Sequence, residues 1–396
     1  MIKRKEIYLD HAATTPIDRT VLKKMEPYLK EKYGNPSSIH QFGEIARQAV
    51  NKSRQQIADF FGCLPEEIYF TSGATESDNW AIRGIVEKVI SQEKIKPHLI
   101  TSSIEHKAVL SLCQYLFKKK LIDLTLLNVN QDGLIEIEDL KKAIKKDTRL
   151  VSIMFANSEI GTVQPIRQIG EFLKKENQKR KNKILFYTDA VQAINYLNSK
   201  VDYLGVDLLS FSSHKIYGPK GIGGIYIKQG TPIKPLLIGG GHEKGMRSGT
   251  ENVPGIVGFG EAIKKINYSQ NDKIKKLRNQ LITGIMKEIP DVSLNGSLRE
   301  RLPSNAHLTF KGVEGEGIVF DLSQRGVMTS TSSACASHSL SPSHVLMAIG
   351  LPVELAHSSV RFTLGKETSS SDINYVLKIL PGIIKRLRKI SGYKHV

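Results

Sequence analysis

The chain of 396 residues has only three cysteines, Cys63, Cys113 and Cys335, and they lie far apart. An odd number of widely spaced cysteines argues against a disulfide framework and suits reduced thiols. The sequence contains no CxxC pair of the kind that holds structural zinc. It also has no apolar run near the N-terminus that is long enough for a signal peptide or a membrane helix. We therefore expect a cytoplasmic protein that has no membrane partner.

Internal repeats and low-complexity tracts are also lacking. With 40% hydrophobic and 24% charged residues, the composition is that of a soluble globular protein. The net charge of +18 could attract nucleic acid or acidic proteins. Its lysines are scattered over positions such as Lys141, Lys142, Lys145 and Lys146, which are typical of solvated helix faces. We therefore expect no direct contact with nucleic acid.

Short apolar runs alternate with stretches of helical period, which predicts an α/β protein with a mainly parallel sheet covered by helices. These runs are 99–100, 124–129, 150–155, 184–187 and 208–211. A helix is expected over 44–61, ended by Gly62. After a Gly-rich stretch at 239–260, an amphipathic helix around 274–285, a strand near 307–310 and a last helix from about 372 follow. We predict a large domain over 16–260 and a smaller α+β domain made of 1–15 and 261–396.

Lys215 follows one of the expected strands and precedes a Gly/Pro turn at 218–221. A lysine amine can bind an aldehyde cofactor covalently when its surroundings lower its pKa. Ligands of α/β proteins usually bind at the strand ends. A single loop lysine is more often a surface charge, so a cofactor site here requires partner residues of matching chemistry.

Three segments supply such partners, each directly after an expected strand. The turn 71–75 opens a helix, so its backbone N–H groups and Thr75 could hold a phosphate. Asp189 could pair with a protonated pyridine nitrogen, although a helix N-cap explains it equally well. His106 could stack on a ring and move protons, although a structural histidine is the commoner case. Because all four sites close strands of one sheet, together they favour a single cofactor site.

Small and polar residues surround Cys335 in the segment 329–339, which leaves little apolar surface for docking. We therefore expect an exposed nucleophilic thiol on a mobile loop at about 328–340. Cys63 and Cys113 have apolar neighbours and are expected to be buried. His338 and His344 could suggest a metal ion, but no second cysteine or acidic ligand accompanies them, so we predict no metal site.

Nearly the whole chain resembles the cysteine desulfurases, PLP-dependent enzymes of the class-V aminotransferase type that supply sulfur for iron–sulfur clusters and tRNA thiolation. The resemblance implies PLP-dependent transferase fold type I, with a mainly parallel seven-stranded sheet in the large domain. The motifs that carry it are YLDHAATTP at 8–16, GNP at 34–36, TSGATESDN at 71–79, NSEIG at 157–161, SSHKIYGPKG at 212–221, GGGHEKGMRSGT at 239–250, SAC at 333–335 and AHSSVRF at 356–362.

The same resemblance implies a role for each site residue. Lys215 would hold PLP, Cys335 would receive the sulfur, and His106 would stack on the cofactor ring and act in catalysis. The other cofactor contacts would be Asp189 at the pyridine nitrogen, Gln192 at the phenolic oxygen, Ala74, Thr75, Asn157, Ser212 and His214, with Thr250 supplied by the second subunit of a homodimer. Asn157 and Arg361 would hold the substrate carboxylate, for which a planar guanidinium is well suited.

The implied reaction converts L-cysteine to L-alanine and leaves a persulfide on Cys335. The sulfur would pass to an iron–sulfur scaffold protein and, as a second destination, to tRNA-thiolation acceptors. Leu340 and Pro342 match the long-loop branch, whereas serine replaces the usual glycine at 213 and at 332 or 333. The chain ends at Val396 without most of the tail with which some relatives dock a scaffold, so partner choice stays open. A selenocysteine lyase or another PLP lyase is the alternative, and a non-enzymatic sulfur-relay or nucleic-acid-binding protein is a more distant one.

Overall fold

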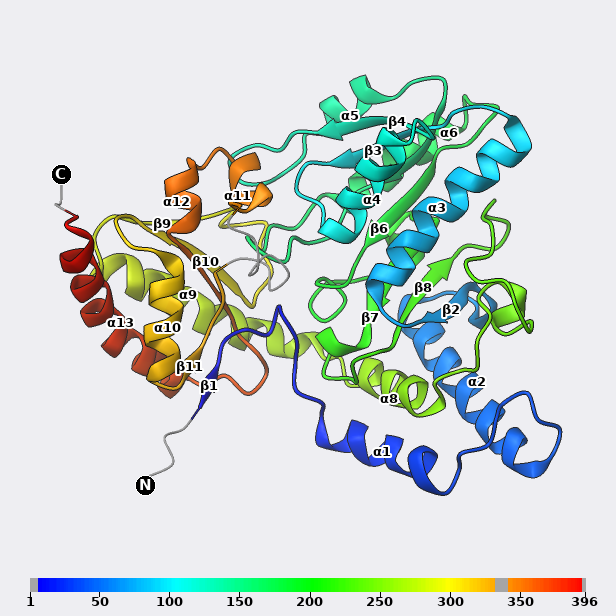
Figure 1. The fold of residues 1–396 in the computed structure, drawn as a ribbon, viewed down its shortest axis with the longest axis horizontal. Coiled ribbons are helices and arrows are strands. Elements are labelled where there is room, and N and C mark those ends of the chain that lie inside the picture. Colours follow the sequence, from blue (N-terminus) through cyan, green and yellow to red (C-terminus); the bar gives the residue numbers. More distant parts are fainter. Residues whose placement is uncertain (1–5, 332–340, 394–396) are drawn as a thin grey trace.

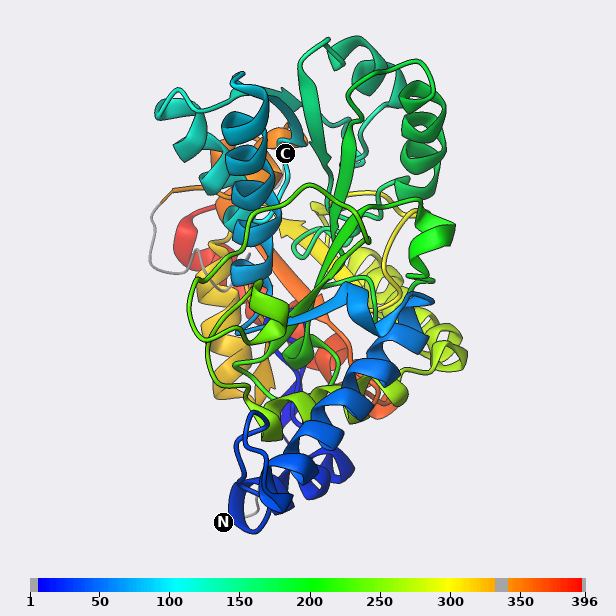
Figure 2. The same cartoon turned by 90° about the vertical axis from the view of Figure 1, so that its right-hand side faces the viewer.

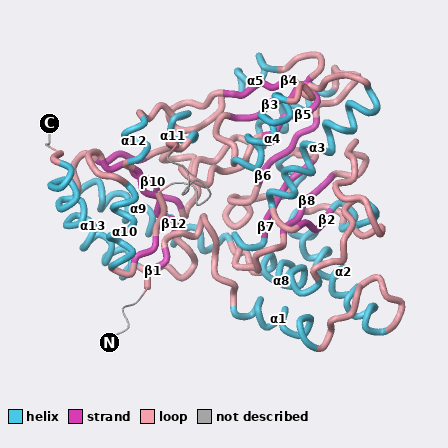
Figure 3. Tube along the Cα trace, viewed as in Figure 1, coloured by secondary structure: helices cyan, strands magenta, loops and turns pink. Residues whose placement is uncertain are grey.

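The structure, a computed structural model, describes residues 6–331 and 341–393. Figure 1 shows a larger group of elements around a long twisted sheet and a smaller group around a short one. Figure 3 shows the same arrangement by element type. The large sheet has the spatial order β2 (Ile68–Thr71), β8 (Gly223–Ile227), β7 (Leu208–Ser212), β6 (Leu185–Asp189), β5 (Thr148–Ser152), β3 (His98–Ser102) and β4 (Asp123–Leu127).

The direction of the strands decides which of their ends lie together. β8 runs antiparallel to both β2 and β7, whereas every other neighbouring pair in this sheet is parallel. The expected mainly parallel seven-stranded sheet is therefore confirmed. Two successive reversals leave β2 running in the same direction as β7. The carboxyl ends of β2, β3, β6 and β7 thus lie at one edge of the sheet, where α/β proteins bind ligands.

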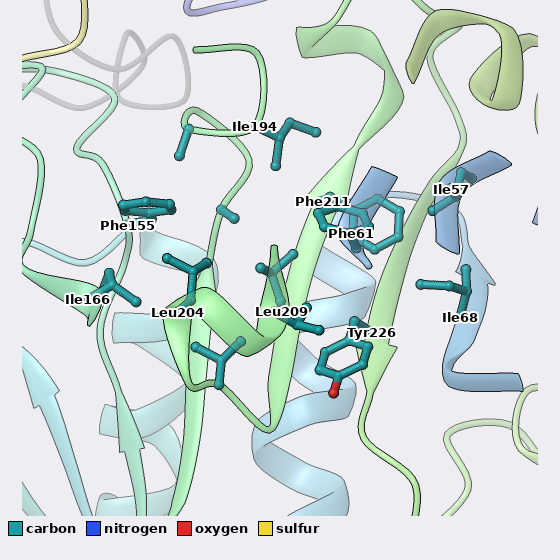
Figure 4. Packing of buried hydrophobic residues seen from close by; sticks show 14 of the residues in the cluster. Ile57, Phe61, Ile68, Phe155, Ile166, Ile194, Leu204, Leu209, Phe211 and Tyr226 are labelled. Atoms are coloured by element: carbon teal, nitrogen blue, oxygen red, sulfur yellow. The ribbon is translucent and has the colours of Figure 1, made fainter. Parts of the chain in front are cut away.

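Successive side chains of the central strands enter two different cores, as the period of a strand requires. Leu209 and Phe211 face the first core, and Leu208 faces the second. In the first core Phe61 packs on Phe211, with ring centroids 4.7 Å apart (Figure 4). Figure 2 shows helices on both sides of the sheet. The first core is covered by α1 (Arg19–Lys30), α2 (Gln41–Phe61), α5 (Ile137–Ala143), α6 (Ile166–Asn177), α7 (Val201–Leu204) and α8 (Val253–Lys264), and the second by α3 (Ala74–Glu93) and α4 (Lys107–Lys118).

The helix expected over 44–61 is confirmed as α2. It begins three residues earlier, where the His40 ring accepts a hydrogen bond from the Gly43 N–H at 3.3 Å. It ends at Gly62, whose φ of 69° lies in the left-handed region that glycine adopts without strain. Its buried face carries Ala46, Ala49, Val50, Ile57 and Phe61.

The smaller group has its own core, built from 7–9 and from 274–384. The chain passes from the first core to this one between Ile266 and Ile274, a few residues beyond the expected boundary at 260. Its elements are the antiparallel strands β12 (Ser359–Thr363), β10 (Asn305–Phe310) and β9 (Val292–Leu294), the parallel pair β1 (Ile7–Tyr8) and β11 (Val327–Met328), and the helices α9 (Asn271–Glu288), α10 (Gly315–Gln324), α11 (His344–Ala348), α12 (Val353–His357) and α13 (Ser370–Ser391). The division into two domains stays our prediction.

Short 3₁₀ turns complete the described elements: η1 (Pro65–Glu67), η2 (Ser213–Lys215), η3 (Glu243–Gly245) and η4 (Tyr268–Gln270). In the part of the chain that the structure describes, no helix is both long and apolar enough to cross a bilayer.

Candidate active site

A cavity of about 660 Å³ lies at the carboxyl edge of the large sheet. Its size is within the usual range for a small-molecule site. It brings together residues from the ends of β2, β3, β6 and β7, as the strand directions require. The predicted site residues that line it are Ala74, Thr75, His106, Asp189, Gln192, Ser212, His214, Lys215 and Arg361.

Lys215 stands in η2, directly after β7. Its Nζ donates hydrogen bonds to the carbonyl oxygens of Ala12, at 2.5 Å, and Ala13, at 2.7 Å. Gln192 Nε2 donates to the same Ala12 oxygen at 3.0 Å. A segment some 200 residues away in sequence thus forms the wall that faces the amine. We did not predict this wall from the sequence.

Asp189 is the last residue of β6 and is 7% exposed. Its Oδ1 accepts a hydrogen bond from the Val191 N–H at 2.9 Å, so the residue also caps the turn that follows. Burial raises the pKa of Asp189, and this effect is opposed by His106, by the Val191 N–H and by Lys215. A cationic partner in the cavity would favour the ionised carboxylate.

His106 is the N-cap of α4, where its Nδ1 accepts a hydrogen bond from the Ala108 N–H at 3.2 Å. The same ring lines the cavity together with Asp189 and Lys215. The structural and functional explanations of this histidine are therefore compatible. Because the cap engages Nδ1, it also fixes the orientation of the ring.

Another part of the cavity lies at the start of α3, where the backbone N–H groups of a helix attract anions. Gly73 precedes this helix, and a Cβ at Gly73 would meet no atom within 4 Å, so the space in front of the helix is open. His214 Nδ1 lies 3.1 Å from Thr14 Oγ1. Burial, together with the charges of Lys215 and Lys220, lowers the pKa of His214 to about 4, so this ring is neutral at neutral pH.

Arg361, in β12, reaches the cavity from the smaller group and is 1% exposed. Its Nη1 donates to the Ser158 carbonyl at 3.0 Å and its Nη2 to Asp10 Oδ1 at 2.9 Å. Its buried Nε has no partner among the described residues. A guanidinium held on two sides, with N–H groups still unused, is suited to bind an incoming carboxylate. Asp10 and Ser158 were missed in the sequence, because local patterns do not reveal contacts between distant segments.

Asn157 is buried beside the cavity but is not one of the residues that line it. Its Nδ2 donates to the Ile104 carbonyl at 2.9 Å, and its Oδ1 accepts from the N–H groups of Glu159 at 2.9 Å and Ile160 at 3.0 Å. Through these bonds the side-chain amide of Asn157 holds the loop that carries Ser158 in its conformation. Its predicted contact with cofactor and substrate stays a prediction.

Comparison with known proteins agrees with this geometry. The aminotransferase class-V family matches residues 7–376. The chain is 49% identical to a protein named cysteine desulfurase IscS from Dictyoglomus turgidum, over 99% of this chain and 98% of that protein. It belongs to the cysteine desulfurases of the class-V aminotransferase family. A solved structure named NifS-like protein superposes with a TM-score of 0.89 and 38% identity, covering 97% of this chain and all of the other. Another solved structure, named SspA in complex with cysteine, superposes with a TM-score of 0.80 and 38% identity, covering 92% of this chain and all of the other.

Cysteine desulfurases are in general PLP-dependent, and the residues of this cavity fit that cofactor. An amine, Lys215, could bind its aldehyde, and the buried carboxylate of Asp189 could face its ring nitrogen. The open space in front of α3, with Thr75, Ser212 and His214 around it, could take its phosphate. Ser213, where the resemblance implied glycine, does not have a positive φ, so the conformational freedom of glycine is not required there.

Besides Asn157, one more described residue of the predicted site, Thr250, does not line this cavity, and Cys335 lies outside the described residues. Thr250 lines a separate cavity of about 160 Å³ beneath the Gly-rich segment 239–250. His344, which we considered as a metal ligand, donates from Nε2 to the Glu105 carbonyl at 2.9 Å. Across residues 6–331 and 341–393, no cluster of three metal-ligating side chains occurs.

Proposed function

We propose that this cysteine desulfurase binds PLP at Lys215 and takes the sulfur of L-cysteine onto Cys335, releasing L-alanine. The sulfur–carbon bond of the substrate breaks, its β-carbon gains a proton, and a sulfur–sulfur bond forms on Cys335. The observation that carries the proposal is the convergence of Lys215, Asp189 and Arg361 on one cavity. The solved neighbour in complex with cysteine supports this substrate class.

PLP, when bound, supplies an electron sink for bond cleavage next to the amino group of its substrate. The residues proposed to hold it are Lys215 at the aldehyde, Asp189 at the ring nitrogen, His106 over the ring, Gln192 at the phenolic oxygen, and Ala74, Thr75, Ser212 and His214 at the phosphate. Thr250 does not line the proposed cofactor cavity of its own chain. We therefore propose that it contacts the phosphate of the cofactor bound by a second copy of the chain. A homodimer is therefore part of the proposal.

Lys215 would have a second role as a base. When its amine is not joined to the cofactor, it would move the α-proton of the substrate. Its hydrogen bonds to the carbonyls of Ala12 and Ala13 offer it a defined position for this proton transfer. Gln192 holds the Ala12 carbonyl in place through its own bond.

Arg361 fixes the substrate by its carboxylate. The guanidinium, whose Nε has no partner among the described residues, would supply the hydrogen bonds. Asp10 keeps the guanidinium oriented and partly neutralised while the site is empty of substrate. A substrate carboxylate held there would bring the α-carbon toward Lys215, which lines the same cavity.

Beyond the chemistry, we propose that the sulfur enters iron–sulfur cluster assembly through a scaffold protein, in the cytoplasm, and that tRNA-thiolation proteins are a second acceptor. Support comes from the family resemblance and from the name of the 49%-identical relative. Transfer assays with purified acceptors would decide between the two destinations.

The test combines a spectrum with product analysis. Purified protein supplied with PLP should show a visible absorption band that is lost in Lys215→Ala, and it should form alanine from cysteine. Cys335→Ala should keep the band but lose alanine formation with cysteine. Full activity of that variant on cysteine would instead favour a lyase that needs no loop thiol. A colourless protein that makes no alanine would overturn the proposal.

A further inference from the structure

The Gly-rich segment 239–250 crosses the outer edge of β2 in a strained conformation. Glu243 and Lys244 both have positive φ, 47° and 60°. Two consecutive non-glycine residues in the left-handed region are rare, and such strain persists only where the surroundings impose it. Glycine would relieve it, and the segment already contains several glycines. The side chain of Glu243 must therefore contribute something that glycine cannot.

That contribution is a buried ion pair with Arg54 of α2. Arg54 Nη1 lies 2.9 Å from Glu243 Oε2 and Nη2 lies 2.6 Å from Oε1, so two parallel bonds join the groups. The two side chains are 11% and 3% exposed. Paired bonds of this kind fix direction as well as distance.

The pair also completes the free edge of the large sheet. β2 is the terminal strand, so the polar backbone groups on its outer side have no neighbouring strand. Arg54 Nη1 donates to the Ile68 carbonyl at 2.6 Å, and Glu243 Oε2 accepts from the Phe70 N–H at 2.9 Å. The two side chains thus take the place of a missing strand and attach η3 to β2.

A second charged pair joins the same segment to the turn after β2. Arg247 Nε lies 2.8 Å from Glu76 Oε1. Glu76 Oε2 in turn accepts from the Ser72 N–H at 3.0 Å and from the Ser72 hydroxyl. Burial alone would raise the pKa of Glu76, but the bonds from Arg247 and Ser72 hold the pKa below its ordinary value. Strand β2 and the turn that leads to Thr75 are therefore both tied to the segment that ends at Thr250.

We propose that Arg54 and Glu243 are positioning residues that clamp the segment 239–250 to β2, and so preorganise the phosphate side of the cofactor site and the placement of Thr250. The cofactor half of this inference rests on the proposed function. The clamp itself is a property of the polypeptide without any ligand.

The test uses the full-length protein. Glu243→Gln removes the charge, Arg54→Lys removes the paired donors, and Glu243→Gly removes the side chain together with the backbone strain. In the protein without cofactor, hydrogen exchange in 239–250 should become faster by about tenfold or more. In titrations, the Kd for PLP should rise by about tenfold.

Arg149→Lys is the matched control. Arg149 is also a buried arginine, 6% exposed in its side chain, and it pairs with Glu93 at 2.7 Å. It lies near the start of β5, at the amino end of the parallel strands, whereas the cavity lies at their carboxyl end. This variant should leave both the exchange of 239–250 and the affinity for PLP unchanged.

The clamp is overturned if the backbone amides of 239–250 exchange as slowly in Glu243→Gly as in the wild type. The side chain of Glu243 would then not hold the segment. The positioning role is overturned if the segment loosens while PLP binds as tightly as before. Failure of the proposed function would look different, because the wild type itself would then bind no PLP. The exchange data would in that case still decide on the clamp.

Discussion

The two ends of the large sheet differ in how completely their buried polar groups are hydrogen-bonded. At the amino end, His98 uses both ring nitrogens, with Nδ1 bonded to Thr148 Oγ1 and Nε2 to Thr125 Oγ1, each at 2.8 Å. At the carboxyl end, next to the cavity, several buried polar atoms have no hydrogen-bond partner among the described residues. They are Thr101 Oγ1, Ser103 Oγ, Ser152 Oγ, Asp78 Oδ2 and Glu105 Oε2.

An unpaired buried polar group lowers stability, so it is kept only where something else requires it. Asp78 receives a hydrogen bond of 2.5 Å from the Tyr187 hydroxyl, which also lies 2.9 Å from Ser210 Oγ. Ser210 is the register partner of Asp189 on the neighbouring strand. The carboxyl end thus has unpaired polar groups near Asp189, while at the amino end both ring nitrogens of His98 are paired. Substitutions at the two ends should therefore separate chemistry from stability.

The largest effect is expected at the carboxyl end from Lys215→Ala. In the proposed mechanism, loss of the amine removes both cofactor attachment and proton transfer, so alanine formation should fall by about 10³-fold or more. The free energy of unfolding without cofactor should change by no more than about 1 kcal/mol, because Lys215 lines the cavity and is only half-buried. Alanine assays and urea unfolding measure the two quantities. Retained turnover would exclude Lys215 as the cofactor lysine.

Asp189→Asn should have the next largest effect. The amide keeps an oxygen for the Val191 N–H but cannot balance a positive ring nitrogen. Alanine formation should therefore fall by about 10²- to 10⁴-fold while the protein stays folded. Stopped-flow measurement of substrate deprotonation would locate the loss in the chemical step. If the variant were as fast as the wild type, Asp189 would be only a turn cap.

At the amino end, His98→Leu should show the opposite pattern. It leaves the hydroxyls of Thr148 and Thr125 without their ring partner, which should lower the free energy of unfolding by roughly 1–3 kcal/mol. The kcat per folded molecule should not change, because His98 does not line the cavity. Urea unfolding and kinetics on the same preparation test this contrast. A large loss of kcat with unchanged stability would contradict it.

The smallest effect is a pH dependence from the carboxyl end. Burial raises the pKa of Asp78 from 3.8 to about 7 and that of Glu105 from 4.5 to about 8, with the charge of Asp189 acting in the same direction. Their protonated forms are favoured in the folded state. This stabilisation is fully present below the ordinary pKa values and is lost as pH rises through the folded ones.

Glu105→Gln should flatten that pH dependence. Between about pH 5 and pH 8.5, the wild type should lose roughly 1–3 kcal/mol more unfolding free energy than the variant. Urea unfolding at several pH values measures the difference, and Arg149→Lys, which exchanges one cation for another, serves as a background whose slope should match the wild type. Parallel slopes for wild type and Glu105→Gln would show that Glu105 is ionised throughout.

Much of the fold and part of the site could be read from the sequence. Lys215, Asp189, His106 and Thr75 each follow an apolar run, and this local pattern is sufficient to place them at strand ends. The direction of β8 could also have been inferred. It follows β7 after too few residues for a parallel crossover, so the pair must be antiparallel.

What the sequence did not reveal depends on contacts between distant segments. Ala12 meets Lys215 across 203 positions, and Asp10 meets Arg361 across 351. No local period encodes such pairs. Asn157 shows the reverse case, since its amide is occupied by the backbone of neighbouring residues. An Asn two and three positions before the N–H groups it accepts from is a turn signal that could have been recognised.

The wall facing Lys215 has a practical consequence for anyone who handles the protein. The strand just before it, β1, pairs with β11 in the smaller group, and only a few residues then separate it from the carbonyls that hold the amine. Truncation past Ile7 would remove that tether, so progressive trimming from the front should abolish colour and turnover before it abolishes folding.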